Sequence, residues 1–146
     1  MSKNSKKKWL IRIKKAFTKR DQEESHILGD FSEDRFESMV RTLIRQRHMP
    51  WLLGISRASA SEDWIKKVDF RLRVSFHDGT HLNEFSIPVN VKSSFKGVED
   101  FRKENPNSRV YPIGMLYNIN LKWLSRILSN IYRKERFVMS RILIAK

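Results

Sequence analysis

The chain has 146 residues, a hydrophobic content of 40% and a formal net charge of +14. A chain of this length forms a single domain that buries about two-thirds of its unfolded surface. With no cysteine it has neither a disulfide framework nor a thiolate metal site, and no apolar run approaches the length of a membrane span. The positive charge favours a polyanionic partner.

Residues 1–28 are predicted to be a basic N-terminal extension, and its first twenty residues contain no acid. A basic amphipathic helix here would lie along nucleic-acid phosphates or on an anionic membrane surface. A solvated helix held to the domain by Trp9 and Phe17 is the alternative, and a mitochondrial-type presequence is a further one. The expected phosphate contacts include Lys7, Lys8, Lys14 and Lys15.

The folded domain is predicted over residues 29–146, starting with a helix capped by Ser32. Glu37 falls at the flank of the apolar stripe of this helix, where its carboxylate could reach the margin of a packed sheet. An ordinary exposed glutamate is the alternative, and Glu33 projects on a similar side. The stripe consists of Phe36, Met39, Val40, Leu43 and Ile44.

A short buried strand is predicted at residues 51–55, followed by strands at 64–76 and 85–94 that form a hairpin. Apolar side chains alternate with polar ones along both strands of the hairpin, so each strand has one polar face. The polar face of the first strand carries Asp69, Arg71 and Arg73, and that of the second carries Pro88, Asn90 and Lys92.

The turn of this hairpin determines which polar residues meet. A two-residue turn at 78–79 places Asp69 opposite Pro88, with Asn90 as a diagonal neighbour about 7–8 Å away. A longer loop would slide the register by pairs. An acid, an amide and a lysine then gather at one end of the hairpin, and a solvated polar face is the alternative interpretation.

The remaining chain predicts a helix at 97–104, a turn at 105–107 and a strand at 109–114. Apolar residues at helical spacing predict a last helix over 121–131, with Asn120 as its cap. The tail at 137–144 is compatible with a continued helix or a late strand. The predicted order of elements is therefore α-β-β-β-α-β-α.

The segments Lys67-Val68-Asp69-Phe70 and Asn90-Val91-Lys92-Ser93-Ser94, with the helix glutamate of Phe36-Glu37, resemble the PD-(D/E)XK nuclease superfamily. This superfamily includes restriction endonucleases and Holliday-junction resolvases. The resemblance covers residues 29–132 and implies a restriction endonuclease-like α/β core, a four-stranded mixed sheet flanked by helices in one domain. One position departs from the family, because Asn90 stands where an acid is usual.

The resemblance implies a site for Mg²⁺ or Mn²⁺ with Asp69 as the principal ligand. The side-chain oxygen of Asn90 and the backbone carbonyl of Val91 would add neutral ligands, and Glu37 would bind directly or through water. Lys92 would orient the attacking water and stabilise charge on the scissile phosphate.

Further contacts to nucleic acid are expected from Arg71, Arg73, Ser93 and Ser94. The alternatives are that the arginines pair with acids and that the serines cap the next helix. We expect a cytoplasmic nuclease, nucleoid-associated if bacterial, that acts on duplex or branched DNA and requires a divalent metal, as a monomer or homodimer. Two alternatives are a catalytically weak nucleic-acid-binding protein with the same fold and a basic protein that contacts a membrane or an acidic partner.

Overall fold

The computed structural model describes residues 31–61, 66–77 and 79–144. Lys7, Lys8, Lys14 and Lys15, in the predicted extension, lie outside the described residues. The chain is helical over residues 31–46, and the elements that follow are β1 (Leu52–Arg57), β2 (Phe70–His77), β3 (Leu82–Lys92), α2 (Phe95–Glu104), β4 (Tyr111–Gly114) and α3 (Leu121–Ile144).

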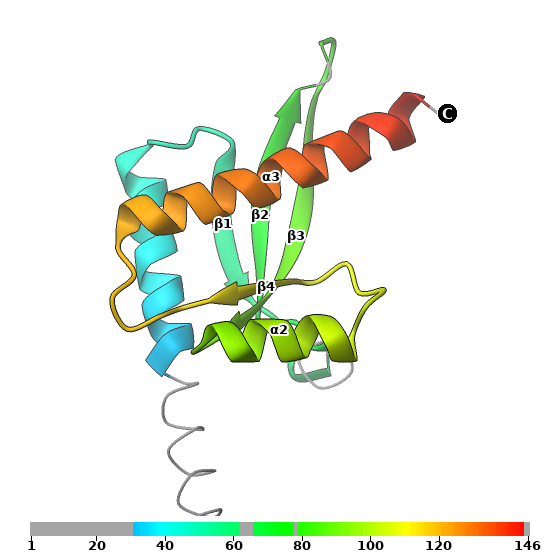
Figure 1. Cartoon of the computed structure of the whole chain (residues 1–146). Helices are drawn as coiled ribbons and strands as arrows, with labels where there is room; N and C mark the ends of the chain where they lie inside the picture. Colours follow the sequence, from blue (N-terminus) through cyan, green and yellow to red (C-terminus); the bar gives the residue numbers. More distant parts are fainter. Residues whose placement is uncertain (1–30, 62–65, 78, 145–146) are drawn as a thin grey trace, which may run out of the picture.

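The four strands form one mixed sheet in the order β1-β2-β3-β4 (Figure 1). The pairs β1–β2 and β2–β3 are antiparallel, whereas β3–β4 is parallel. The parallel pair requires a crossover connection, and α2 lies within it. The structure therefore confirms an α/β domain with a four-stranded mixed sheet and the predicted order of elements.

The register of the β2–β3 hairpin differs from that of a two-residue turn. His77 pairs with Leu82, so the connection spans residues 78–81, and Pro88 lies opposite Arg71. The longer loop slides β3 by two residues relative to β2, as pairing in a hairpin depends on loop length. Pro88 is consequently not the partner of Asp69.

The core lies on one face of the sheet. Phe70, Leu72, Val74 and Phe76 alternate along β2, and each is at most 3% exposed. Two helices cover this face, since the core cluster joins β2 to side chains from residues 31–46 and from α3. The helical members of the cluster are Phe36, Val40, Leu43, Leu124, Leu128 and Ile131.

α2 packs against the side of β3 that carries Lys92, opposite the side of Val91. A Cβ atom at Gly97 would lie 3.2 Å from the Cβ atom of Lys92, so glycine permits this close approach. Ser94 caps the helix by accepting a hydrogen bond of 3.0 Å from the amide of Gly97.

Most element boundaries differ from the sequence-based prediction: β1 covers 52–57 instead of 51–55, β3 covers 82–92 instead of 85–94, and β4 covers 111–114 instead of 109–114. β2 begins at Phe70 instead of residue 64, because Lys67 has a φ of 60° that extended backbone does not adopt. α2 begins two residues early, at the residue that follows its Ser94 cap. Ser32 is buried inside the helix and is not its cap, and the tail at 137–144 continues α3.

We expect Phe70→Ala to lower the free energy of unfolding by about 3–5 kcal/mol, because it removes a fully buried ring that packs 5.3 Å from the ring of Phe36. Phe95 is 67% exposed, so Phe95→Ala should change this free energy by only about 0.5 kcal/mol. Urea unfolding followed by circular dichroism measures both values. Similar losses in the two variants would contradict the proposed core.

Candidate functional site

Asp69 immediately precedes β2, and its backbone amide donates a hydrogen bond of 2.9 Å to the carbonyl of Val89. Regular pairing ends at Phe70 and Val89, yet β3 continues to Lys92. The Oδ2 atom of Asp69 accepts a hydrogen bond of 2.7 Å from the backbone amide of Val91. The carboxylate thus takes the place of a strand carbonyl and satisfies an amide that β2 no longer reaches. Asp69 is held in this way against the end of β3.

Asn90 lies at the same strand end and is only 5% exposed. Its Nδ2 atom donates a hydrogen bond of 2.7 Å to the carbonyl of Lys67, which determines the orientation of the amide. Its Oδ1 atom is buried and has no hydrogen-bond partner among the described residues. A buried acceptor without a partner is costly, so this oxygen is a candidate ligand atom.

Lys92 is the last residue of β3 and is half-buried. Its Nζ atom lies 5.6 Å from the centre of the Phe101 ring, a cation–π contact with α2. Its carbonyl accepts a hydrogen bond of 2.7 Å from the amide of Met115. The strand end therefore presents a carboxylate, an amide oxygen and a lysine, which we call the strand-end site (Asp69, Asn90 and Lys92).

Glu37 makes a different contact from the expected one. Its Oε2 atom lies 3.3 Å from the Nε atom of Arg57, at the end of β1. Arg57 also binds the Oδ1 atom of Asp34 at 2.6 Å and stacks over the ring of Phe70. The pairing of Glu37 with Arg57 occupies the carboxylate expected to approach the metal.

The sequence analysis did not identify Arg57 as the partner of the helix acids. A signal was present, because Glu33 and Glu37 lie one helical turn apart and place two carboxylates on one side of the helix, where a cation can pair with them. Burial opposes its charge, but the hydrogen bond to Asp34 and the charge of Glu37 outweigh burial and raise the pKa of Arg57. The guanidinium therefore stays charged and holds the helix end to β1.

The other residues predicted to contact nucleic acid, two arginines and two serines, lie on different elements. Arg73 is exposed and lies over Gly54 of β1, where a Cβ atom would be 3.4 Å from the Nε atom of Arg73. Arg71 is half-buried opposite Pro88. Ser94 serves as the cap of α2, as the alternative interpretation anticipated, and Ser93 is exposed beside it.

Comparison of the chain with family models, curated proteins and solved structures found no match. Within the described residues no group of three or more His, Cys, Asp or Glu side chains could hold a metal ion. None of the described helices combines the length and apolar character needed to cross a bilayer.

Asp69→Ala should lower the free energy of unfolding by about 1–3 kcal/mol, because it leaves the amide of Val91 without its acceptor. Asp69→Asn keeps an acceptor oxygen at the same position and should cost about 1 kcal/mol or less. Thermal and urea unfolding compare the two variants. Equal losses would show that the charge of Asp69, and not its hydrogen bond, stabilises the strand end.

Proposed function

We propose that the protein is a metal-dependent nuclease that hydrolyses phosphodiester bonds of DNA and has a restriction endonuclease-like core. The position of Asp69, Asn90 and Lys92 at one end of the β2–β3 hairpin supports the proposal most strongly. The order and pairing of the strands are compatible with the core of the PD-(D/E)XK superfamily. The positive net charge suits a nucleic-acid substrate.

The donor atoms at the strand-end site fit a hard divalent cation. Mg²⁺ prefers oxygen ligands and retains several waters, so a carboxylate and neutral oxygens suffice when phosphate completes the shell. Asp69, the Oδ1 atom of Asn90 and the carbonyl of Val91 would hold Mg²⁺ or Mn²⁺. Glu37 would act through water, because Arg57 occupies its carboxylate. A bound divalent ion would neutralise phosphate charge and activate water.

Lys92 would stabilise the negative charge that develops on the phosphate during hydrolysis. The ring of Phe101 holds its ammonium group on the α2 side of β3, which limits the conformations available to a long side chain. Asp69 would keep its position through the amide of Val91, so the two charged groups need little rearrangement when DNA binds.

Further contacts to the phosphate backbone would come from two arginines on β2, Arg71 and Arg73, and from the lysines and arginines among residues 1–20. We propose duplex or branched DNA as the substrate and a cytoplasmic location, with a homodimer where both strands are cut. Ser93 would be available to bind phosphate, whereas the hydroxyl of Ser94 is engaged in capping α2.

A second candidate function is nucleic-acid binding with weak or no catalysis. Two observations favour it: Asn90 supplies a neutral oxygen where the superfamily usually has an acid, and Glu37 is paired with Arg57. Both features reduce the negative charge available to a metal. The fold and the basic surface would then serve binding alone.

A cleavage assay separates the two functions. Wild-type protein should cut supercoiled, linear or branched DNA with Mg²⁺ or Mn²⁺ and leave it intact in EDTA. Asp69→Asn and Lys92→Met should each slow cleavage by about 100-fold or more, since each removes a charged group while preserving the local packing. Lys96→Met, which removes a positive charge from an exposed position on α2, is the matched control.

The outcomes of this assay are distinct. Intact DNA with every metal, together with measurable DNA binding, would establish the second function. Cleavage that survives both Asp69→Asn and Lys92→Met would place the reaction elsewhere on the protein.

Asn90→Asp should destabilise the protein in EDTA by about 3 kcal/mol, because it puts a carboxylate at a buried position beside the carbonyl of Lys67. Mg²⁺ should raise the melting temperature of this variant more than that of the wild type, because the added charge strengthens ion binding. Asn130→Asp, at an exposed position on α3, is the control. An equal Mg²⁺ response in all three proteins would argue against a metal at Asn90.

A further inference from the structure

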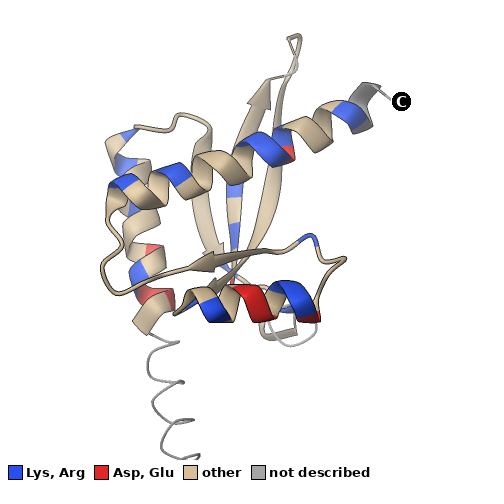
Figure 2. Cartoon of the chain, viewed as in Figure 1, with Lys and Arg blue, Asp and Glu red and all other residues tan. Residues whose placement is uncertain are grey.

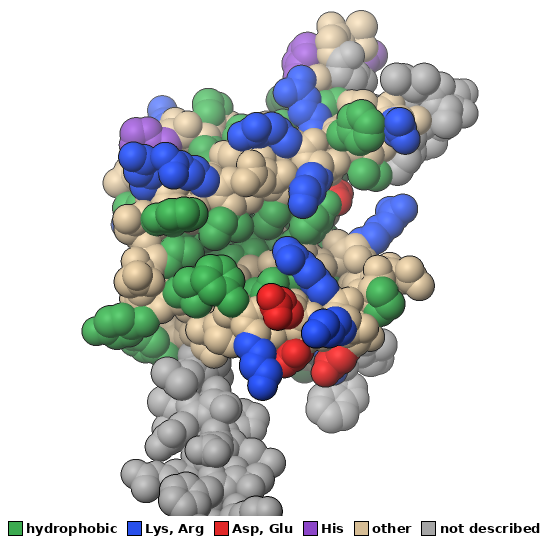
Figure 3. Space-filling model, viewed as in Figure 1, with side chains coloured by type: hydrophobic (Ala, Val, Ile, Leu, Met, Phe, Trp, Pro, Cys, Tyr) green, Lys and Arg blue, Asp and Glu red, His purple; other side chains and the backbone are tan. Residues whose placement is uncertain are grey.

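A groove of about 720 Å³ runs along the open edge of β4. Its walls are the C-terminal end of α2, the connection over residues 105–110 and residues 134–139 of α3. We call it the β4-edge groove. In Figure 3, Lys and Arg side chains lie on both the α3 side and the α2 side of this part of the surface.

The lining of the β4-edge groove carries positive charge. Three exposed cations contribute from three different segments, namely Arg102, Arg109 and Lys134. Among the residues that the structure describes, Glu135 is the sole acid that lines the groove, and it is also the sole acid in α3 (Figure 2). Anions entering the groove therefore meet a surplus of cations from α2, the connection and α3.

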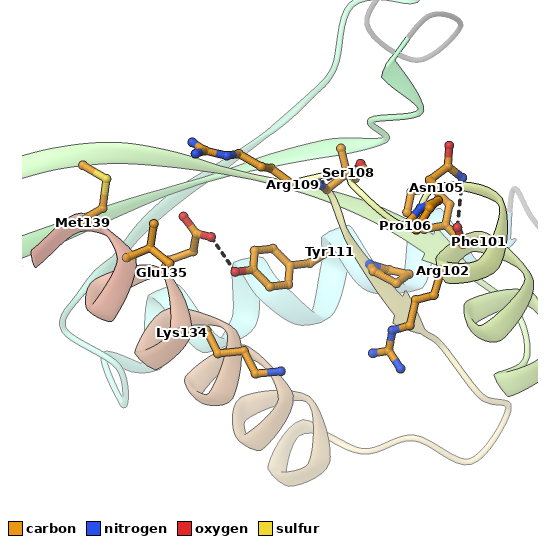
Figure 4. Close-up of a pocket in the computed structure, with 13 residues that line it drawn as sticks. Phe101, Arg102, Asn105, Pro106, Ser108, Arg109, Tyr111, Lys134, Glu135 and Met139 are labelled. Carbon is orange, nitrogen blue, oxygen red and sulfur yellow. Dashed lines mark hydrogen bonds between the residues drawn. The ribbon is translucent and has the colours of Figure 1, made fainter. Parts of the chain in front are cut away.

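Glu135 is engaged by a hydrogen bond within the groove. Its Oε1 atom accepts a hydrogen bond of 2.5 Å from the hydroxyl of Tyr111, and Figure 4 shows the two side chains pointing toward each other. Burial and this hydrogen bond raise the pKa of Tyr111, so the phenol remains a donor at neutral pH. Glu135 is thereby turned toward β4.

An apolar wall accompanies the cations. Val138 is 38% exposed, and Met139 and Pro106 lie in the same lining. Proteins hold unpaired bases and their phosphates by combining cations with aromatic side chains on which bases stack, and Tyr111 adds an aromatic ring to this apolar lining. A duplex keeps its bases stacked inside, so it would bring phosphates to the cations and leave the apolar wall uncovered.

A peptide strand would be a poor occupant of the same edge. β4 has only four residues, and Pro112, which pairs in register with Asn90, has no amide hydrogen to donate. A strand added outside β4 would find few hydrogen-bonding groups, whereas phosphates would find three cations.

We infer that the β4-edge groove binds single-stranded nucleic acid, with phosphates on Arg102, Arg109 and Lys134 and a base against the Val138 wall. Phe101 connects this groove to the strand-end site, because it lines the groove and its ring contacts Lys92. A strand in the groove would thus pass close to Lys92. Binding in the groove requires no hydrolysis, so it stands independently of the proposed nuclease activity.

The test measures binding of a fluorescent single-stranded oligothymidylate by anisotropy, in EDTA, with full-length protein. The double variant Arg102→Ala/Lys134→Ala removes two groove cations. Its control is Lys103→Ala/Arg133→Ala, which removes two positive charges from the adjacent positions on the same helices, outside the groove lining. Both variants keep the basic N-terminal residues and have the same net charge.

The groove variant should bind about tenfold more weakly than the wild type, and the control less than about threefold, because only the first loses phosphate contacts. The salt dependence of the groove variant should also be shallower by about 1.4 log units per log unit of salt, at about 0.7 for each lost single-strand phosphate contact. Arg102→Lys/Lys134→Arg keeps both charges and should restore most of the affinity.

Equal weakening of binding in the two double variants would overturn the inference, because it would show that affinity depends on the net charge of the protein and not on the groove residues. Weakening of duplex binding by the groove variant to the same extent as single-strand binding, at the same oligonucleotide length, would overturn it as well. Because all measurements are made in EDTA, loss of the groove effect and loss of DNA cleavage are separate results. Circular dichroism and melting temperature verify that the variants are folded.

Discussion

Burial of alternate side chains along β2 is the constraint on which the rest of the structure depends. β2 pairs with β1 on one side and with β3 on the other, and its apolar face lies under the helix over residues 31–46 and under α3. Phe70 joins these layers, because its ring packs against Phe36 and lies under the guanidinium of Arg57. Regular pairing with β3 starts at Phe70, although Val68 is already buried, and the polar residue between them, Asp69, lies where this regular pairing ends.

The strand-end site follows from the end of that pairing. β3 extends beyond its pairing with β2, so its amides need another partner, and the side chain of Asp69 provides one for Val91. Asn90 is buried at the same place with an oxygen that no described residue satisfies. A buried oxygen without a hydrogen bond lowers the stability of the fold. Groups of this kind are common at sites that bind a ligand, whereas a residue with only a structural role usually has its polar atoms paired.

Two regions of different chemistry meet at Phe101. On one side of it lies Lys92, at the strand-end site, and on the other lies the β4-edge groove with its cations. Glu37 belongs to neither region as defined, and its carboxylate is paired with Arg57 at the end of β1. Positive charge is therefore available to phosphate along the edge of the sheet. Of the three residues of the strand-end site, Asp69 alone is negatively charged. This distribution of charge suits a polyanionic ligand. A metal bound at the strand end would have few protein ligands, and phosphate oxygens would complete its ligand shell.

The periodicity of the sequence by itself determined the order of the elements and the buried faces of the strands, since alternation and helical spacing are local properties of the chain. It also brought Asp69, Asn90 and Lys92 to one end of the hairpin. Only the tertiary structure decided the register, because the loop at 78–81 is longer than a two-residue turn, and the start of β2, because Lys67 leaves the extended conformation. It also decided the partner of Glu37 and the contact between Tyr111 and Glu135, which lie 24 positions apart on different elements. Such pairings depend on how helices and strands pack in three dimensions, and no local pattern along the chain encodes them.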